Sequence, residues 1–139
     1  MGELLIRKLS LCRDRIQKIR GSLPAAPEDV LKDERTEAFI AFNLFLLIQD
    51  AIDLAAHLIA ERGLGVPASH REVFEILSRA NLITPDSAQA MSLMASLRNR
   101  IAHSYGDLDP VRMVRETPGG LDAATRFFDE IVRSTSAPA

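Results

Sequence analysis

The segment from residue 33 to residue 62 constrains the fold most, because apolar side chains cover almost every side of the helix that it predicts. A helix of this kind lies at the centre of a bundle or at a subunit interface. Its most apolar part, residues 38–48, is interrupted by Asn43 and ends at Gln49, which makes it too short to span a bilayer. The chain is therefore expected to be an all-α bundle, soluble and without a membrane segment.

Several shorter helices are expected around this central one. They cover residues 3–22, a short piece after Pro27, residues 69 to about 80 with Ser69 as cap, the segment from the cap Thr84 to about Tyr105, residues 111–115, and about 120–134. The sequence Thr117-Pro118-Gly119-Gly120 is expected to form a turn between the last two helices. With 139 residues, 47% of them apolar, the chain is interpreted as a single domain over residues 1–139.

The charge and the cysteine content limit the binding partners and the cellular location that can be expected. The net charge of −2 gives no overall basic surface, which counts against non-specific duplex binding but not against a small cleft that contacts a few phosphates. The basic residues of the first helix form either a solvated outer face or a flank that guides RNA. The single cysteine, Cys12, lies on an apolar seam and is expected to be buried. No signal peptide is apparent, because Arg7 and Lys8 are not followed by a long apolar run, so a cytoplasmic location is expected.

The segment from Arg98 to Tyr105 carries the chemically active side chains. A guanidinium binds phosphate through a bidentate fork, and an imidazole can move a proton near neutral pH. Phosphodiester cleavage without a metal requires this pairing. Arg98 and His103, however, are five positions apart, about 140° around an ideal helix, whereas Asn99 and His103 share a face. Either the helix loosens near His103, or a second copy of the chain brings the two groups together.

A polar stripe on the central helix is the other notable feature. Asn43, Asp50, Asp53, His57 and Glu61 fall within about 80° of one another around the helix. Buried carboxylates need partners, and the arginines of the Arg98–Tyr105 segment are the obvious ones. Asp50, Asp53 and His57 are thus expected either to form internal salt bridges or to orient Arg98 or His103. Their spacing would also suit a divalent metal, but no further ligand set stands out, and no metal is expected.

The pattern R-x-x-x-x-H-x-Y formed by Arg98, His103 and Tyr105 resembles the signature of the HEPN superfamily, specifically its HepT-like toxins. Residues 49–57 resemble the second helix of HepT-like chains, and the helix order and length agree, so the resemblance covers essentially the whole chain. It implies an all-α, HEPN-type up-and-down bundle of four to five main helices plus short helices, assembled as a homodimer. Arg98 and His103 match the catalytic pair, and Asn99 matches the polar residue often found beside that arginine.

The resemblance also implies an activity, a metal-independent endoribonuclease of a type VII toxin–antitoxin system without a cofactor. Arg98 would stabilise phosphoryl charge, His103 would act as acid or base, and Asn99 would hold a phosphate oxygen or the His103 ring. The candidate substrates are tRNA and mRNA. The alternative is a non-catalytic HEPN subunit of a nucleotidyltransferase complex. A degraded R-x4-H pattern is typical of that class, so the intact pattern favours the enzyme.

The resemblance further implies a partner, a minimal nucleotidyltransferase that acts as antitoxin by linking AMP to Tyr105. Tyr105 lies two residues after His103, where the predicted helix gives way to Gly106, so its ring would be both near the cleft and reachable. The other interpretations of Tyr105 are that it caps the bundle or contacts RNA.

Overall fold

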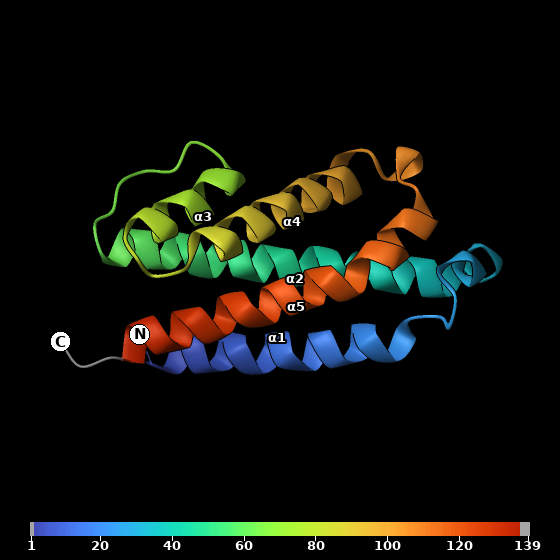
Figure 1. Cartoon of the computed structure of the whole chain (residues 1–139), viewed down its shortest axis with the longest axis horizontal. Coiled ribbons are helices and arrows are strands. Elements are labelled where there is room, and N and C mark those ends of the chain that lie inside the picture. Colours follow the sequence, from blue (N-terminus) through green and yellow to red (C-terminus); the bar gives the residue numbers. More distant parts are fainter. Residues whose placement is uncertain (1, 137–139) are drawn as a thin grey trace.

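The computed structural model describes residues 2–136, and this part of the chain consists of five α-helices and two short 3-10 helices, without a strand (Figure 1). The elements are α1 (Gly2–Ser22), η1 (Pro27–Lys32), α2 (Glu34–Glu61), α3 (His70–Arg79), α4 (Pro85–His103), η2 (Tyr105–Asp107) and α5 (Pro110–Ser136). The predicted all-α, up-and-down bundle is confirmed.

Helix α2 is the centre of the bundle, as its apolar composition predicts. It contacts all four other α-helices, and Leu44, Leu47 and Leu58 are completely buried. By length and composition alone α2 could cross a membrane, but more than half of that apolar window is buried among its neighbours. This burial is typical of the core helix of a soluble protein.

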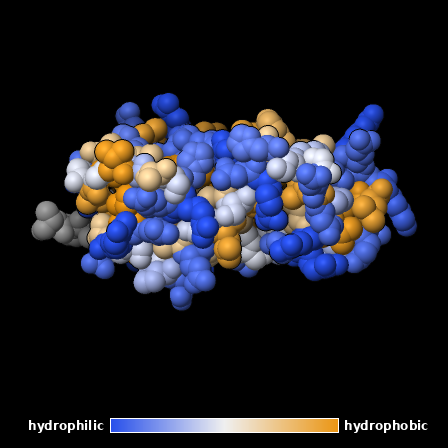
Figure 2. All heavy atoms as spheres, turned by 90° about the horizontal axis from the view of Figure 1, so that it is seen from above, coloured by the Kyte–Doolittle hydropathy of each residue, from blue (hydrophilic) through white to orange (hydrophobic). Residues whose placement is uncertain are grey.

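Successive long helices run in opposite directions along the bundle (Figure 1). Lys8 and Arg15 of α1 contact Asp50 and Asn43 of α2, respectively, which fixes the antiparallel register of the first pair. Helix α4 returns beside α2, α5 runs back beside α4, and the short α3 packs against both α2 and α4. The face that carries α3 and α4 is largely hydrophilic, and its apolar atoms form separate patches (Figure 2).

Local signals at the helix ends and on the first helix are confirmed. The hydroxyl oxygens of Ser69 and Thr84 accept hydrogen bonds from the backbone N–H groups of Glu72 and Ser87, both at 3.2 Å. These are N-caps, which satisfy backbone donors that the helix itself cannot pair. Cys12 is completely buried, as its place on the apolar seam of α1 predicts.

The predicted turn at residues 117–120 is wrong, because α5 continues through it as one helix. The reason lies in the apolar periodicity, which passes through the Pro-Gly-Gly sequence without a shift. Its buried positions include Met113, Thr117, Leu121, Ala124, Phe128 and Ile131. Burial of this face on α2 and α4 outweighs the cost of an exposed proline inside the helix.

Gly120 has a packing role instead of a turn role. A Cβ atom at this position would lie 2.8 Å from Sδ of Met94 on α4. Real Cβ atoms do not approach a neighbour so closely, so a side chain here would displace Met94. Gly120 therefore leaves room for the flexible end of the Met94 side chain.

We expect Pro118→Ala to raise the free energy of unfolding by about 1–2 kcal/mol, part of the roughly 3 kcal/mol difference between proline and alanine inside a helix. Proline cannot donate to the carbonyl of Val114 one turn earlier, and alanine restores that hydrogen bond. Urea denaturation followed by circular dichroism measures the change. A variant less stable than the wild type would show that the proline suits the path of α5.

Candidate functional site

The sequence-predicted site lies at the C-terminal end of α4 and in the 3-10 turn that follows. Helix α4 is regular through His103, and the N–H of Ser104 still donates to the carbonyl of Arg100 at 2.9 Å. The helix therefore does not loosen before His103. Arg98 and His103 of one chain remain on different sides of α4, about 140° apart.

Arg98 is held in place by α2 and by its own neighbour. Its Nε donates to Oε1 of Gln49 at 3.0 Å, its Nη1 donates to Oδ1 of Asn99 at 3.1 Å, and its Cζ lies 4.8 Å from the centre of the Phe45 ring. Within residues 2–136 no carboxylate forms an ion pair with Arg98. The guanidinium is thus oriented by neutral groups, and its charge is available to an anion.

Within residues 2–136 no hydrogen bond joins Asn99 to His103, although the two residues share one face of α4. The carboxamide oxygen of Asn99 accepts a hydrogen bond from Nη1 of Arg98. His103, the last residue of α4, is exposed, and its side chain forms no hydrogen bond within the described chain. The imidazole is accessible to a ligand or to another protein chain.

Of the two roles expected for Asp50, Asp53 and His57, internal pairing holds for Asp50 and His57, and within residues 2–136 none of the three bonds directly to an arginine of the motif. Lys8 of α1 donates to Asp50 at 2.9 Å, and the hydrogen bond holds the pKa of the lysine above its ordinary value. His57 lies 3.3 Å from Glu61 on the same helix. Both Asp53 and His57 are exposed, so they did not require a buried partner. In residues 2–136 no group of three or more His, Cys, Asp or Glu side chains comes together to hold a metal.

Asp53 nevertheless reaches Arg98 through one intermediate residue. Gln49 donates from Nε2 to Oδ1 of Asp53 at 2.8 Å and accepts at Oε1 from Arg98. A glutamine amide can do both at once, and the carboxylate fixes which way the amide faces. The sequence did not reveal this link, although a glutamine that ends an apolar run was a usable signal.

Tyr105 belongs to η2 and leans against the first turn of α2. Its phenol hydroxyl donates to Oε2 of Glu37 at 2.7 Å, and the residue is 39% exposed. Partial burial, followed by the hydrogen bond and charge of Glu37 and the charge of Glu34, raises the pKa of the phenol to about 12. The phenol is therefore neutral near pH 7 and reachable from solvent. Glu37 was not predicted as its partner.

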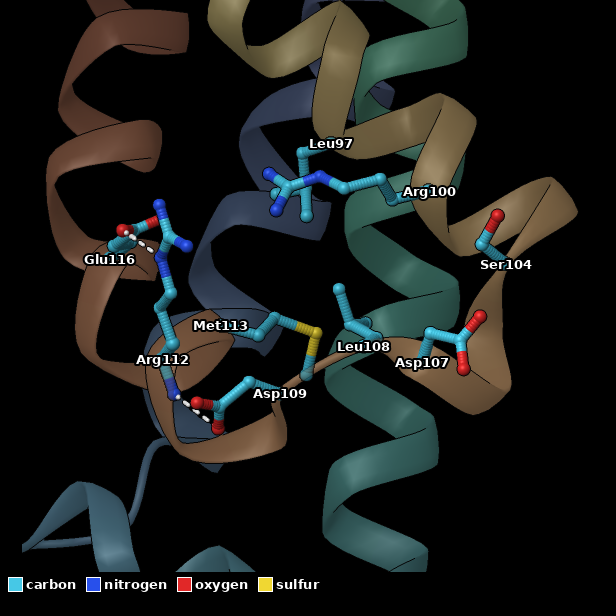
Figure 3. Close-up of a pocket in the computed structure, with 9 residues that line it drawn as sticks. All are labelled: Leu97, Arg100, Ser104, Asp107, Leu108, Asp109, Arg112, Met113 and Glu116. Atoms are coloured by element: carbon cyan, nitrogen blue, oxygen red, sulfur yellow. Dashed lines mark hydrogen bonds and ion pairs between the residues drawn. The ribbon is translucent and has the colours of Figure 1, made fainter.

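A separate cavity of about 140 Å³ opens between the end of α4 and the start of α5 (Figure 3). Arg100 and Arg112 both extend toward it, and Asp107, Asp109 and Glu116 also line it. It contains neither Arg98 nor His103. Its three carboxylates outnumber its two guanidinium groups, so it has no excess of positive charge for a phosphate.

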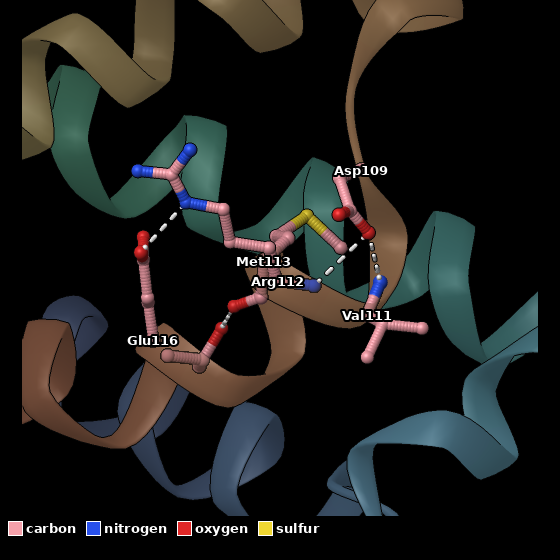
Figure 4. Close-up of polar contacts among 6 residues, drawn as sticks. Asp109, Val111, Arg112, Met113 and Glu116 are labelled. Atoms are coloured by element: carbon pink, nitrogen blue, oxygen red, sulfur yellow. Dashed lines mark hydrogen bonds and ion pairs between the residues drawn. The ribbon is translucent and has the colours of Figure 1, made fainter.

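Two of these carboxylates already have structural partners (Figure 4). Glu116 accepts from Nε of Arg112 at 2.9 Å. Asp109 accepts from the N–H groups of Val111 and Arg112 at 3.1 and 3.2 Å, as the predicted cap of α5. These contacts fix the beginning of α5 and hence the connection that carries η2.

The sequence matches the family described as Ribonuclease HepT-like over residues 12–131. One relative, the mRNA nuclease HepT of Shewanella oneidensis, is 30% identical over 135 residues, which are 94% of this chain and 98% of the relative. Another, the tRNA nuclease HepT of Aphanizomenon flos-aquae, is 34% identical over 83 residues, covering 60% of this chain and 56% of the relative.

Solved structures give the same result at the level of the fold. A tri-AMPylated HEPN toxin of Shewanella oneidensis, in complex with an MNT antitoxin, superposes with a TM-score of 0.88 at 26% identity. The match covers 96% of this chain and 99% of that chain. A toxin–antitoxin structure with AMP-PNP superposes with a TM-score of 0.85 at 26% identity, over 94% of this chain and 99% of that chain.

Proposed function

Because this chain belongs to the Ribonuclease HepT-like family, we propose that it is the metal-independent endoribonuclease toxin of a HEPN/MNT toxin–antitoxin pair. The observation that carries the proposal is the state of Arg98, which Gln49, Asn99 and Phe45 orient without neutralising. An oriented guanidinium without an internal counter-ion is suited to a phosphate. The alternative of a non-catalytic subunit loses support, because the two HepT relatives are named nucleases.

In the proposed reaction the RNA 2′-OH attacks the adjacent phosphorus, the bond to the 5′-oxygen breaks, and a 2′,3′-cyclic phosphate remains. Arg98 keeps N–H donors beyond the two that Gln49 and Asn99 engage, and these stabilise the charge on the phosphoryl oxygens. One proton must leave the 2′-OH and another must reach the leaving oxygen, and His103 performs one of these transfers.

The proposal is tested by the chemical ends of the RNA fragments. Purified protein is incubated with tRNA and with mRNA, and the termini of the products are identified by mass spectrometry. A 2′,3′-cyclic phosphate on one fragment and a 5′-hydroxyl on the other are expected. Fragments with a 3′-hydroxyl and a 5′-phosphate would contradict the mechanism, because they require water rather than the 2′-OH as nucleophile.

Asp53 and Asp50 have different roles in this proposal. Asp53 orients Gln49, and Gln49 orients Arg98, so both are positioning residues. Asp50 joins α1 to α2 through Lys8 and serves the scaffold. His57, which pairs with Glu61 one turn further along α2, has no part in the reaction.

We expect Gln49→Ala to slow RNA cleavage by about 10-fold with little change in stability, because small misplacements of a catalytic group are costly. Asp50→Asn, the matched control on α2, should instead lower the free energy of unfolding by about 1–3 kcal/mol and leave cleavage nearly unchanged, since it removes the charged partner of the largely buried Lys8. Cleavage rates and urea denaturation of both variants test this. The reverse pattern would assign the positioning role to Asp50.

A homodimer is part of the proposal, because one chain supplies only one His103 and keeps it apart from Arg98 on α4. Helix α2 also exposes two large apolar side chains, Phe39 at 40% and Phe42 at 60%. They lie in the half of α2 that also contains Glu37, the partner of Tyr105, and thus near the end of α4. We propose that this face of α2 joins two copies so that their motifs face each other.

Light scattering should therefore find a dimer at micromolar concentration, with an interface in the range of about 1,200–2,000 Å² that stable complexes bury. Phe42→Glu should shift the protein toward monomers and reduce cleavage, because it places a charge in an apolar contact. Glu75→Gln, on the exposed face of α3, serves as the control. A wild-type monomer would rule out the dimeric site.

The antitoxin is proposed to be a minimal nucleotidyltransferase that links AMP to Tyr105. The Shewanella oneidensis toxin is tri-AMPylated in its complex with an MNT antitoxin. In this chain Tyr105 is accessible and lies two residues after His103, the last residue of α4. Each AMP would bring a negative phosphodiester and a purine to the site, so inhibition follows from charge pairing with Arg98 and from steric exclusion of RNA.

A further inference from the structure

The contact between Tyr105 and Glu37 has no part in RNA cleavage as derived above. It joins the turn after α4 to the first turn of α2 across 68 positions of sequence, at 2.7 Å between the phenol oxygen and Oε2 of Glu37. The first turn of α2 is itself fixed, because Asp33 accepts from both the N–H and the hydroxyl of Thr36. The N–H of Glu37 donates to the carbonyl of Asp33 at 3.1 Å. The backbone that carries the Glu37 carboxylate is thus fixed beside the phenol.

We propose that Glu37 is the general base for the modification of Tyr105, an inference that rests on the proposed function, in which a nucleotidyltransferase modifies this tyrosine. The phenol oxygen attacks the α-phosphorus of a nucleoside triphosphate bound by the transferase. The new O–P bond forms, the bond to pyrophosphate breaks, and pyrophosphate leaves. The phenol proton passes to Oε2 of Glu37 and from there to solvent.

Tyr105 needs such a base, because a neutral phenol is a weak nucleophile. Burial and the neighbouring carboxylates raise the pKa of its hydroxyl to about 12, so very little phenolate exists near pH 7. The proton must therefore leave while the O–P bond forms. A general base must lie within hydrogen-bond reach of the proton that it accepts, and Glu37 meets this condition in the unmodified protein.

The hydrogen bond of the phenol identifies Glu37, and not its neighbour Glu34, as the base. Glu34 lies in the same turn and contributes to the electrostatic environment of Tyr105, but the phenol hydrogen bond goes to Glu37. The proposed role of Glu37 is also limited to the first addition of AMP. A phenol oxygen accepts a single AMP, so any further AMP must attach to the AMP already present. Glu37 can act only on the first addition.

The experiment follows AMP transfer by intact-protein mass spectrometry, with ATP, magnesium and the cognate nucleotidyltransferase. Glu37→Gln should slow the first addition by about 100-fold, the lower end of the usual range for a general base. Later additions should keep their wild-type rates, so the variant should contain unmodified chains and fully extended ones. Glu34→Gln, the same change three positions earlier in the chain, should behave like the wild type. Thermal melting by circular dichroism confirms that each variant is folded.

A second readout needs no partner. Tyr105 is the only tyrosine, and the chain has no tryptophan, so phenolate absorbance reports on this residue alone. Glu37→Gln should lower the pKa of Tyr105 from about 12 toward its ordinary value, because the carboxylate that favours the neutral phenol is gone. An unchanged titration would show that the contact does not form in solution and would overturn the inference.

The outcomes of the transfer experiment are distinct. An equal first-addition rate in wild type and Glu37→Gln would overturn the role of Glu37 while leaving Tyr105 as the modified residue. A faster first addition in Glu37→Gln would also overturn the role of Glu37 as base. It would show that the hydrogen bond to Glu37 slows the attack of the phenol. Wild-type protein that remains unmodified, although the transferase inhibits it, would instead reject the proposed modification of Tyr105 itself.

Discussion

Arg98→Ala and His103→Ala should each reduce RNA cleavage by about 100-fold or more, the loss typical when a transition-state donor or an acid–base group is removed. Arg98 is the one guanidinium of the motif that α2 orients through Gln49 and Phe45. His103 is exposed at the end of α4, so its removal leaves the core intact. Cleavage of a defined RNA, with melting temperatures measured in parallel, tests both variants.

Arg98→Lys tests separately whether the charge or the planar shape of the guanidinium is needed. Lysine keeps the positive charge but lacks the planar fork that Gln49 and Asn99 orient, so cleavage should still fail. Arg126→Ala, at an exposed arginine on α5, removes a charge away from the motif and should leave cleavage near the wild-type rate. Full activity in Arg98→Lys would mean that charge alone suffices, and the oriented guanidinium would lose its significance.

Co-expression with the cognate nucleotidyltransferase should convert the wild-type protein into an AMP-modified, inactive form, whereas Tyr105→Phe should remain unmodified and fully active. Phenylalanine keeps the ring but removes the only phenol of the chain. The transferase should therefore inhibit the wild-type protein completely and should not inhibit Tyr105→Phe at all. Intact-mass measurement, peptide mapping around residue 105 and an RNA cleavage assay on the same samples provide the test.

One result would contradict this mechanism of inhibition. If the transferase inhibits the wild-type chain and Tyr105→Phe equally, the partner blocks the cleft by contact alone, without covalent modification. Glu130→Gln can serve as an unrelated carboxylate control. Glu130 accepts hydrogen bonds from Thr84 and Ser87 at the start of α4, the end of that helix opposite the motif.

The elements with strong local signals were predicted well. Helix α2 follows from its apolar composition, and the starts of α3 and α4 follow from Ser69 and Thr84, because a cap depends on residues within one turn. The α5 region was not predicted correctly. Pro118 and Gly119-Gly120 are local breaking signals, and only the contact of α5 with α2 and α4 overrides them.

The candidate site was predicted in part for a similar reason. Arg98, Asn99, His103 and Tyr105 are close in sequence, so their chemistry can be recognised without the fold. The residues that orient them come from α2, and sequence alone does not give the rotation of α2 relative to α4. The sequence alone therefore does not distinguish Asp50 from Asp53, although only Asp53 reaches Arg98, and it does so through Gln49.

The measurement that tests the central claim most directly is RNA cleavage by purified wild-type protein in excess EDTA. The proposed chemistry uses only Arg98, His103 and the RNA 2′-OH, so the rate should equal that without chelator. An Arg98→Ala preparation, purified and assayed in the same way, should be inactive, which rules out a contaminating nuclease. Cleavage that disappears with EDTA and returns with magnesium would contradict the mechanism.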